Sequence, residues 1–412
     1  MSAQAPAFGR SKPRGGLNGA VASFLLQHAD LIFRVQRRVL PIINVGKLAI
    51  VSRSDDVREL FLENRHFSVT YGEKLQVIMA NEPFFLVQDA EAAHDHEVNA
   101  LHMAVRPADI PALAKATTAR AQALLAAADG PVEVVGFARQ IAFDVFSDYL
   151  GVTAPAGRDL QEVGQRLFEF QFADPFGDAD LHAEVVQLSA VMRDHLDALI
   201  ASRKAQPAVD DALGRCLALQ AKGRDGFSDV QIRTALLGLL VAMPQLQLIA
   251  ALAMEQLLQR PAELGRAQAL ARSGDNEALA GYTFEALRFD PLAPVIQRRA
   301  RSDHMIAAGT PRQTTISKDA KVWVAVQSAM RDPRRILEPD VFDPTRPWRT
   351  YLHFGDGLHT CFAMAFNRAL VPLMLQPLLK RDGLRRATGS RGRLRRQNLI
   401  PDQLWVAFDR AH

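Results

Sequence analysis

One of the two cysteines in this 412-residue chain follows a glycine-rich loop, a setting in which a thiol can bind a metal. The stretch YLHFGDGLHTCFAMAFNR (351–368) places Gly355 and Gly357 before Cys361, and a helical pattern follows the cysteine. Glycines permit tight turns and the close approach of a flat ligand. A helix start lowers the pKa of a thiol, and a thiolate held there is a good axial ligand for haem iron. For Cys361 alone, an inert core cysteine is the simpler interpretation.

Charged residues upstream of this loop could support it. The stretch YTFEALRFDP places Glu285 and Arg288 three residues apart on one helical face, although surface pairs of this kind are common. Arg298 follows in APVIQRRA, and FDPTR (342–346) leads towards the cysteine loop. The order of these features carries more information than any one of them.

This ordered set resembles the cytochrome P450 family, the haem-thiolate monooxygenases. The cysteine loop of that family reads Phe-Gly-x-Gly-x-His-x-Cys-x-Gly, and its positions are matched by Phe354, Gly355, Gly357, His359 and Cys361. The chain also carries the family's Glu-x-x-Arg motif, and FDPTR and Arg368 lie at family-like distances. The strand–helix pattern LAIVSRSDDVRELFLENRHFS resembles the N-terminal region of the family, so the likeness covers most of residues 40–410.

The resemblance implies a mainly α fold with small β-sheets, in which haem b lies between the central helix and the cysteine-loop helix. Residues 21–412 would form a single haem-thiolate catalytic domain after a flexible tail at 1–20. Cys361 would be the iron ligand, and Glu285 with Arg288 would stabilise the helix that supports its loop. The other residues expected to bind the cofactor are Phe354 and Gly355 in the loop and, at the propionates, His359, Arg298 and His94. Propionates buried with the ring require cationic or hydrogen-bonding partners. An ordinary surface histidine is the alternative for His94.

The sequence departs from the family pattern at several positions near the expected haem. Val98 stands where an arginine often binds a propionate, and His96 replaces another family residue. Ala363 replaces the second glycine of the cysteine loop, and Tyr351 replaces a histidine often found before it. These changes reduce the number of propionate-binding groups that the motif assigns.

The expected central helix contains the most informative departure. Ala235–Met254 is twenty residues without a charge, long enough to span a membrane, but Pro244 and two glutamines at its centre favour a buried helix of a soluble protein. Family members that split dioxygen usually carry Ala-Gly-x-Asp/Glu-Thr here, where acid and hydroxyl deliver protons to the distal oxygen. The aligned residues in this chain are Ala242, Met243, Pro244, Gln245 and Leu246. We take Met243 as a pocket residue and the other four as the catalytic positions. Neither an amide side chain nor leucine can act as that acid–hydroxyl pair.

Pro244 has a consequence of its own. It lacks an N–H, so we expect it to kink the helix and to leave the carbonyl of Leu240 unpaired. A kink could open a groove for water or peroxide, or it could serve packing alone.

Three functions are compatible with these residues. The first is a monooxygenase that receives electrons from a ferredoxin and oxidises an apolar small molecule, with water bound by Gln245 and Gln247 in place of the usual relay. The second is an enzyme that uses hydrogen peroxide or an organic hydroperoxide, as a peroxygenase or by rearrangement, because this chemistry requires no acid–hydroxyl pair. The third is a haem protein without oxygen chemistry, or one that binds a carrier-tethered substrate. Base rates favour the first, and the missing relay favours the second.

The expected substrate pocket is apolar. Its candidate residues come from the stretch before the haem-facing helix, the central helix and PLAPVI, and are Met79, Phe84, Phe85, Ala242, Met243, Leu246, Ala293, Val295 and Ile296. The same residues could equally be plain core.

Composition and charge limit the other classes. Hydrophobic residues are 48% and charged residues 23% of the chain, which is typical of a soluble enzyme, and two cysteines cannot form a disulfide framework. A cytoplasmic location without a membrane span follows as the expectation. The segment 380–396 holds eight basic residues and one acid, but no aromatic residue separates its arginines. A solvated loop or hairpin is therefore favoured over a nucleic-acid surface.

Periodicity predicts a mostly helical chain. A short strand near 47 precedes a helix that begins at Ser54 or Asp55, and helices are expected over 108–150, 158–171, 179–205 and 228–260. Strands are expected at 322–326 and 404–408.

Overall fold

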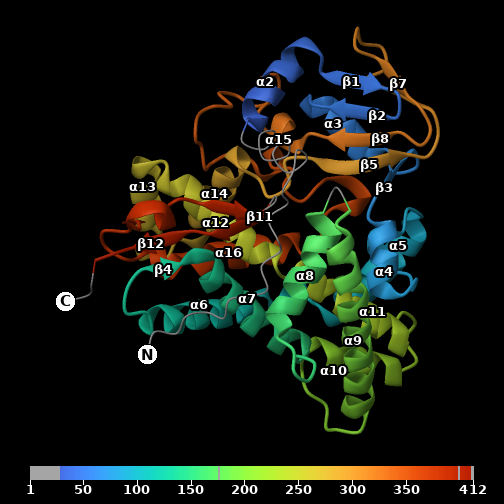
Figure 1. The fold of residues 1–412 in the computed structure, drawn as a ribbon, viewed down its shortest axis with the longest axis vertical. Coiled ribbons are helices and arrows are strands. Elements are labelled where there is room, and N and C mark those ends of the chain that lie inside the picture. The colour runs from blue at the N-terminus through green and yellow to red at the C-terminus, as the bar shows by residue number, and fades with distance from the viewer. Residues whose placement is uncertain (1–27, 175–176, 398–399, 410–412) are drawn as a thin grey trace.

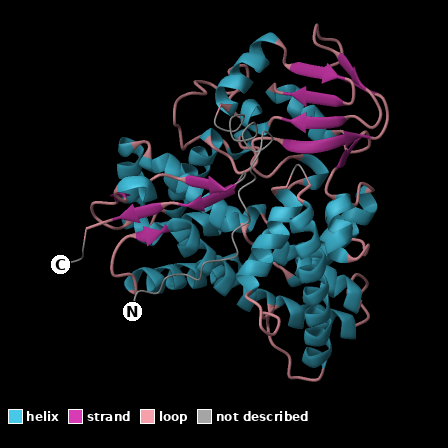
Figure 2. Ribbon diagram, viewed as in Figure 1, coloured by secondary structure: helices cyan, strands magenta, loops and turns pink. Residues whose placement is uncertain are grey.

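The computed structural model describes residues 28–174, 177–397 and 400–409, and within them the chain is mostly helical with small sheets (Figures 1 and 2). The helices are α2 (Ala29–Val39), α3 (Ser54–Leu62), α4 (Gly72–Met79), α5 (Glu91–Ala104), α6 (Ile110–Ala126), α7 (Val134–Leu150), α8 (Leu160–Phe172), α9 (Ala179–Lys204), α10 (Ala212–Ala221), α11 (Asp229–Ala242), α12 (Gln245–Leu258), α13 (Pro261–Ser273), α14 (Asn276–Phe289), α15 (Val326–Ala329) and α16 (Met364–Leu379). The predicted fold class is confirmed, as are the helix start at Ser54 and a helical run in each predicted range. The range 108–150 holds two helices, α6 and α7.

The strands pair segments that lie far apart in the chain. They are β1 (Ile42–Val45), β2 (Leu48–Val51), β3 (Phe67–Val69), β4 (Val132–Glu133), β5 (Ile296–Ala300), β6 (His304–Ile306), β7 (Thr314–Ile316), β8 (Lys321–Val324), β9 (Arg385–Arg386), β10 (Arg395–Gln397), β11 (Ile400–Gln403) and β12 (Trp405–Ala407). The largest sheet has the order β1-β2-β8-β5-β3, and its only parallel pair is β2 with β8, in register from Leu48 opposite Lys321. The strand predicted at 322–326 ends earlier, because Val326 begins α15.

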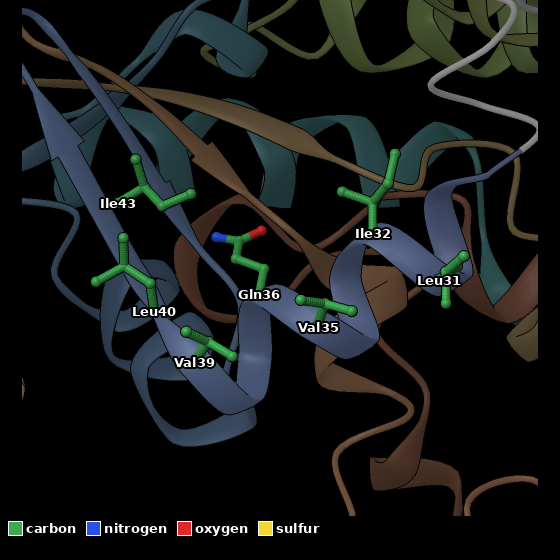
Figure 3. Close-up of a pocket in the computed structure, with 7 residues that line it drawn as sticks. All are labelled: Leu31, Ile32, Val35, Gln36, Val39, Leu40 and Ile43. Atoms are coloured by element: carbon green, nitrogen blue, oxygen red, sulfur yellow. The ribbon is translucent and has the colours of Figure 1, made fainter.

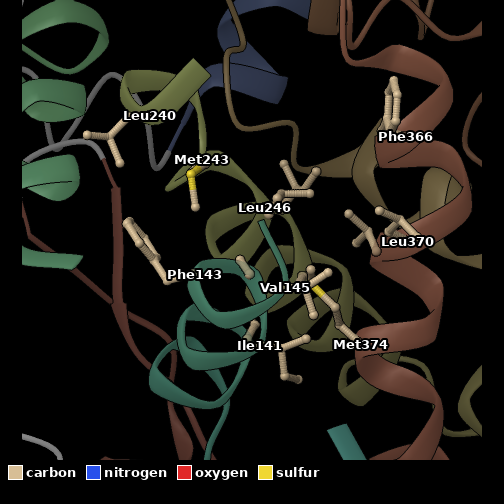
Figure 4. Close-up of a cluster of buried hydrophobic side chains, with 14 of the residues drawn as sticks. Ile141, Phe143, Val145, Leu240, Met243, Leu246, Phe366, Leu370 and Met374 are labelled. Carbon is tan, nitrogen blue, oxygen red and sulfur yellow. The ribbon is translucent and has the colours of Figure 1, made fainter. Parts of the chain in front are cut away.

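The largest apolar core lies where α12 packs against α7, α14 and α16. Figure 4 shows Ile141 and Val145 of α7, Leu246 of α12 and Leu370 of α16 turned towards one another. Each of these four side chains is at least nine-tenths buried. Burial of so many aliphatic groups is the main favourable term that holds the helices together.

The central helix is broken into α11 and α12 by a turn at Met243 and Pro244. The kink expected at the proline is therefore present, but the expected unpaired carbonyl is not. The N–H of Met243 donates to the carbonyl of Leu240 at 3.2 Å, a tighter three-residue bond that replaces the one a proline cannot make. In the described part of the chain, the run Asp229–Leu258 is long and apolar enough to cross a membrane, and 78% of its most apolar window is buried inside the fold. That burial supports an internal helix.

Helix α2 presents an exposed apolar face. Leu31, Val35 and Val39 are each more than half exposed, and α2 and the strand after it line a shallow groove of about 440 Å³ (Figure 3). The tail expected at 1–20 lies outside the described residues.

The basic segment 380–396 runs through β9 and β10, and its arginines are largely paired. Carboxylates outside the segment bind four of them, in the pairs Arg385–Asp409, Arg386–Glu255, Arg395–Asp402 and Arg396–Asp290. These pairs offset much of the local positive charge, in agreement with a solvated loop or hairpin.

Candidate active site

The cysteine loop is built from two glycines and several hydrogen bonds of its backbone. Gly355 and Gly357 adopt φ values of +74° and +71°, a left-handed conformation that strains other residues. The Cys361 N–H donates to the carbonyl of Phe354 at 2.9 Å, and the Met364 N–H donates to the carbonyl of Cys361 at 3.1 Å. The Ala363 N–H donates to the thiol itself. The loop therefore holds the sulfur at a fixed place, three residues before α16 begins.

Gly357 is also a point of close approach between two protein segments. A Cβ atom at this position would lie 2.5 Å from the carbonyl oxygen of Phe61 in α3. At Gly355 the nearest atom to such a Cβ is the carbonyl oxygen of His359, at 3.6 Å. The absence of a side chain at Gly357 therefore allows the loop to pack on α3.

The Cys361 thiol behaves differently from the sequence-based expectation. Burial in the protein raises its pKa to about 11, and the Ala363 N–H lowers it by less. The nearby helix start therefore does not suffice to make a thiolate in the protein alone. A bound metal cation would supply the missing positive charge, which fits this sulfur as a metal ligand.

Buried cationic and hydrogen-bonding groups gather near the loop. The His359 side chain is 3% exposed, and neither of its ring nitrogens has a hydrogen-bond partner among the described residues. The His94 ring, on α5, lies 5.3 Å from the His359 ring in an edge-on arrangement. Two segments 265 residues apart in the chain are thus brought together. Buried ring nitrogens without partners indicate that a further polar group belongs here.

Arg298 is also almost fully buried. Burial of its positive charge is unfavourable, and a negatively charged ligand could offset this desolvation. Burial lowers the pKa of the Arg298 guanidinium, which donates a hydrogen bond to the hydroxyl of Tyr71. Nearby Asp89 raises the same pKa and lies 3.5 Å from His359 Nε2. Asp89 also has an oxygen without a hydrogen-bond partner. Arg298, Tyr71 and His359 are groups that can donate hydrogen bonds to carboxylates such as haem propionates, whereas Asp89 is an acceptor that competes for them.

Tyr71 and Asp89 were not found from the sequence. Neither belongs to a motif, and both lie in segments that the fold brings to the cysteine loop from the N-terminal third of the chain. The substitution of Val98 for arginine was a weak signal, because it implied that another donor would be required.

Glu285 and Arg288 form the tightest polar network next to the loop. Both side chains are fully buried, and two hydrogen bonds of 2.6 and 2.8 Å join them. Arg288 also donates to three backbone carbonyls, those of Met330, Pro339 and Val341. Glu285 accepts from the Asp343 N–H at 2.9 Å and the Tyr351 hydroxyl at 3.2 Å. The pair thereby connects α14 to the segment that enters the cysteine loop.

The predicted pocket residues fall into two groups. Phe84 and Phe85 are buried with ring centres 4.5 Å apart, and the Phe84 ring packs on Gly238 of α11. The Phe85 ring lies 5.8 Å from those of both His94 and Phe362, so it belongs with the cysteine-loop cluster.

The second group follows the end of α14. Val295 is half-buried, Ile296 begins β5 and packs on the sheet core, and Ala293 is exposed. Met79 at the end of α4 is fully buried in the main core.

The catalytic candidates lie at the break between α11 and α12. Met243, Pro244 and Leu246 are buried, whereas Ala242 and Gln245 are half-buried. Figure 4 shows Met243 beside Leu240 and Phe143, with Leu246 between Met243 and Leu370 of α16. No acidic or hydroxyl side chain occurs anywhere in residues 235–254 of the sequence. The break therefore presents apolar and amide groups only.

Comparisons with known proteins agree with this arrangement. Residues 282–382 match the family model for cytochrome P450, a range that includes Glu285, Arg288, Arg298 and Cys361. A bifunctional dioxygenase–epoxy alcohol synthase of Pyricularia oryzae is 31% identical over 120 residues, which are 29% of this chain and 10% of that protein. Cytochrome P450 107B1 of Saccharopolyspora erythraea is 32% identical over 206 residues, 47% of this chain and 46% of that protein. The chain thus spans between a tenth and about half of the length of these relatives.

The fold is similar over nearly the whole chain to a solved structure. The crystal structure of P450BioI in complex with an acyl carrier protein ligated to hexadec-9Z-enoic acid has a TM-score of 0.79 at 21% identity. The similarity covers 94% of this chain and 100% of that chain. Residues 282–382 thus match the sequence pattern of cytochrome P450, and nearly the whole chain has the fold of a solved cytochrome P450 structure.

Proposed function

We propose that this protein is a haem-thiolate enzyme that rearranges an organic hydroperoxide of an apolar, fatty-acid-like molecule. The observation that carries the proposal is the break at Pro244, where Gln245 and Leu246 stand in place of an acid and a hydroxyl. Cleavage of dioxygen needs two delivered protons, whereas a hydroperoxide is already reduced.

The cofactor we propose is haem b, with Cys361 as its iron ligand. His359, Arg298 and His94, which are buried near the loop, would hold the propionates together with Tyr71, and the ring nitrogens of His359 have no hydrogen-bond partner among the described residues. Phe354 and Gly355 would shape the loop under the ring. The haem iron, when bound, supplies the ability to cleave an O–O bond.

The substrate class follows from the chemistry of such a conversion. The O–O bond of an unsaturated hydroperoxide breaks, and new C–O bonds form within the same molecule. Product and substrate are isomers, so no outside electrons enter and no net proton is consumed. The amides at the break would orient the peroxide, and Leu246 with Met243 would exclude water. The resemblance of residues in this chain to a dioxygenase–epoxy alcohol synthase supports this class.

A ferredoxin-dependent monooxygenase is the second candidate. Arg349 and Arg368 are exposed beside the cysteine loop, and the Arg368 guanidinium lies 4.7 Å from the centre of the Trp348 ring. Exposed positive charge at this place suits an acidic electron donor. Such an enzyme would need water at Gln245 to replace the missing relay.

We also propose that residues 21–412 act as one catalytic domain in the cytoplasm. The pairing of β2 with β8 and the contact of α6 with α16 join distant parts of the chain. Both cysteines are free thiols, which suits a reducing compartment.

The test uses purified ferric protein without reductant. We expect an unsaturated fatty acid hydroperoxide to be consumed over many turnovers with the haem absorbance intact, and the product to have the same mass as the substrate. Rapid loss of haem absorbance without product, together with turnover when reduced ferredoxin and dioxygen are supplied, would support the second candidate instead.

A further inference from the structure

A series of side-chain hydrogen bonds connects α8 to the central helix just after the break. The Gln247 Nε2 group of α12 donates to Gln165 Oε1 of α8 at 2.7 Å. The Gln165 Nε2 group in turn donates to Glu169 Oε1, one turn further along α8, at 3.3 Å. Glu169 also accepts from Arg166 NH1 at 2.5 Å, so the series ends on a carboxylate held by a guanidinium.

The Glu169 carboxylate determines which group donates and which accepts in each of these hydrogen bonds. An ionised carboxylate can only accept hydrogen bonds, so Gln165 must turn its NH₂ group towards Glu169. The Gln165 oxygen then faces Gln247, which must donate from its own NH₂ group. The side of Gln247 that remains is therefore its carbonyl oxygen, an acceptor, and the orientation of both amides follows from the network.

The remaining oxygen of Gln247 is unsatisfied. The Gln247 side chain is fully buried, and its Oε1 has no donor among the described residues. An unpaired buried acceptor is costly, and a partner that donates a hydrogen bond would remove that cost. The next residue, Leu248, belongs to an apolar cluster with Phe168 of α8 and Ile400 of β11. An apolar ligand with one donor group fits these surroundings.

We propose that Gln165 and Glu169 are positioning residues that hold Gln247 with its oxygen as an acceptor for a hydroxyl or hydroperoxyl hydrogen of the substrate. This inference rests on the proposed function, since it names the group of the hydroperoxide that the protein recognises. It assigns to α8 a role in substrate choice through an amide two residues away from Gln245.

The test measures binding and requires no turnover. Haem-loaded ferric protein is titrated with a hydroxy fatty acid and with the oxo fatty acid of the same chain, and the change in haem absorbance gives each dissociation constant. The alcohol can donate a hydrogen bond and the ketone cannot. We expect the wild-type protein to bind the alcohol about tenfold more tightly, the size of one hydrogen bond to a buried acceptor.

Two substitutions at one position give opposite expectations. Gln165→Glu keeps an acceptor for the Gln247 NH₂ group, so the preference for the alcohol should persist. Gln165→Lys supplies a donor, which would turn the Gln247 amide around and reduce the preference to about one or reverse it. Gln161→Lys is the matched control, because Gln161 lies one turn earlier on α8 and its side chain binds Gln140 of α7 instead.

The outcomes separate this inference from the proposed function. Equal binding of alcohol and ketone by the wild-type protein, or equal loss of preference in the Glu and Lys variants, would overturn the positioning role. Failure of the hydroperoxide to turn over, with the alcohol preference and its Gln165 dependence intact, would overturn the proposed reaction while leaving the acceptor at Gln247 in place. A simple loss of folding would weaken the binding of both ligands without a change in the ratio of their dissociation constants. An unchanged ratio in the Gln165→Lys protein would count against the positioning role.

Discussion

Glu285 and Arg288 bind each other through two hydrogen bonds, and both side chains are fully buried. Together they connect α14 to the segment that precedes Cys361. Six other groups bind this pair: three carbonyls, one backbone N–H, the Tyr351 hydroxyl and the Arg346 guanidinium. The network makes the position of the cysteine loop depend on one buried ion pair.

Removing one partner of that pair should destabilise the protein strongly. Glu285→Gln leaves the Arg288 charge buried without a counter-ion, and we expect a loss of about 3–5 kcal/mol in the free energy of unfolding, with a lower haem content. Denaturant unfolding and the haem-to-protein absorbance ratio measure both effects. Arg335→Ala is the control, since the Arg335–Asp55 pair is exposed to solvent and should contribute little to stability. Similar losses in the two variants would contradict the role of the buried pair.

The two cysteines should differ sharply in their effect on the haem. Cys361→Ser is expected to abolish the thiolate signature in the absorbance spectrum of the ferrous carbon monoxide complex. Cys216 is buried in α10, where burial raises its pKa to about 12, so Cys216→Ser should leave that spectrum unchanged. A wild-type spectrum from the Cys361→Ser protein would exclude this sulfur as the iron ligand.

Gly357 should tolerate no side chain. Alanine there would combine a left-handed φ with a Cβ atom 2.5 Å from the Phe61 carbonyl oxygen, and we expect about 3 kcal/mol of destabilisation. Gly389 has a φ of +72° and open space around it, so Gly389→Ala should cost only about 1 kcal/mol. Thermal or denaturant unfolding of both variants provides the comparison. Equal costs would mean that the contact with α3 is unimportant.

His353 should make stability depend on pH. Burial lowers its pKa from 6.5 to about 4, while its Nε2 lies 3.0 Å from the Phe284 carbonyl oxygen. Between those values the unfolded chain binds a proton that the folded protein does not, so stability is complete above pH 6.5 and falls as the pH drops towards 4. The full effect is about 3 kcal/mol.

Urea unfolding at pH 7 and pH 5 measures this effect, with His353→Gln as the comparison. The variant should lose less stability between the two pH values than the wild type does. The same loss in both proteins would show that other groups dominate acid destabilisation.

The sequence was sufficient for those parts of the site that depend on local chemistry. Paired glycines and a following helical pattern located the loop around Cys361, and charge-free residues located the central helix. Distant segments could be related only where the family resemblance did so: it placed His94 and His359 at the same propionates, whereas nothing in the sequence relates Gln165 to Gln247. Each pair depends on how α5 and α8 pack against elements far along the chain.

Local reasoning also failed where the backbone could adjust. The proline was expected to leave the Leu240 carbonyl unpaired, but a shift to a three-residue hydrogen bond satisfied it. The Cys361 thiol was expected to be acidified by the helix start, but burial of the whole loop has the larger effect on its pKa. Both misses arise from tertiary structure acting on a correctly located residue.

The most direct test of the proposed reaction is the fate of the two peroxide oxygens. Unsaturated fatty acid hydroperoxide carrying ¹⁸O at both positions is mixed with an equal amount of unlabelled hydroperoxide and given to the ferric protein without reductant. We expect products that contain either two labelled oxygens or none, because both atoms remain in the molecule that brought them. Products with a single label, or turnover only when reduced ferredoxin and dioxygen are present, would contradict an intramolecular rearrangement.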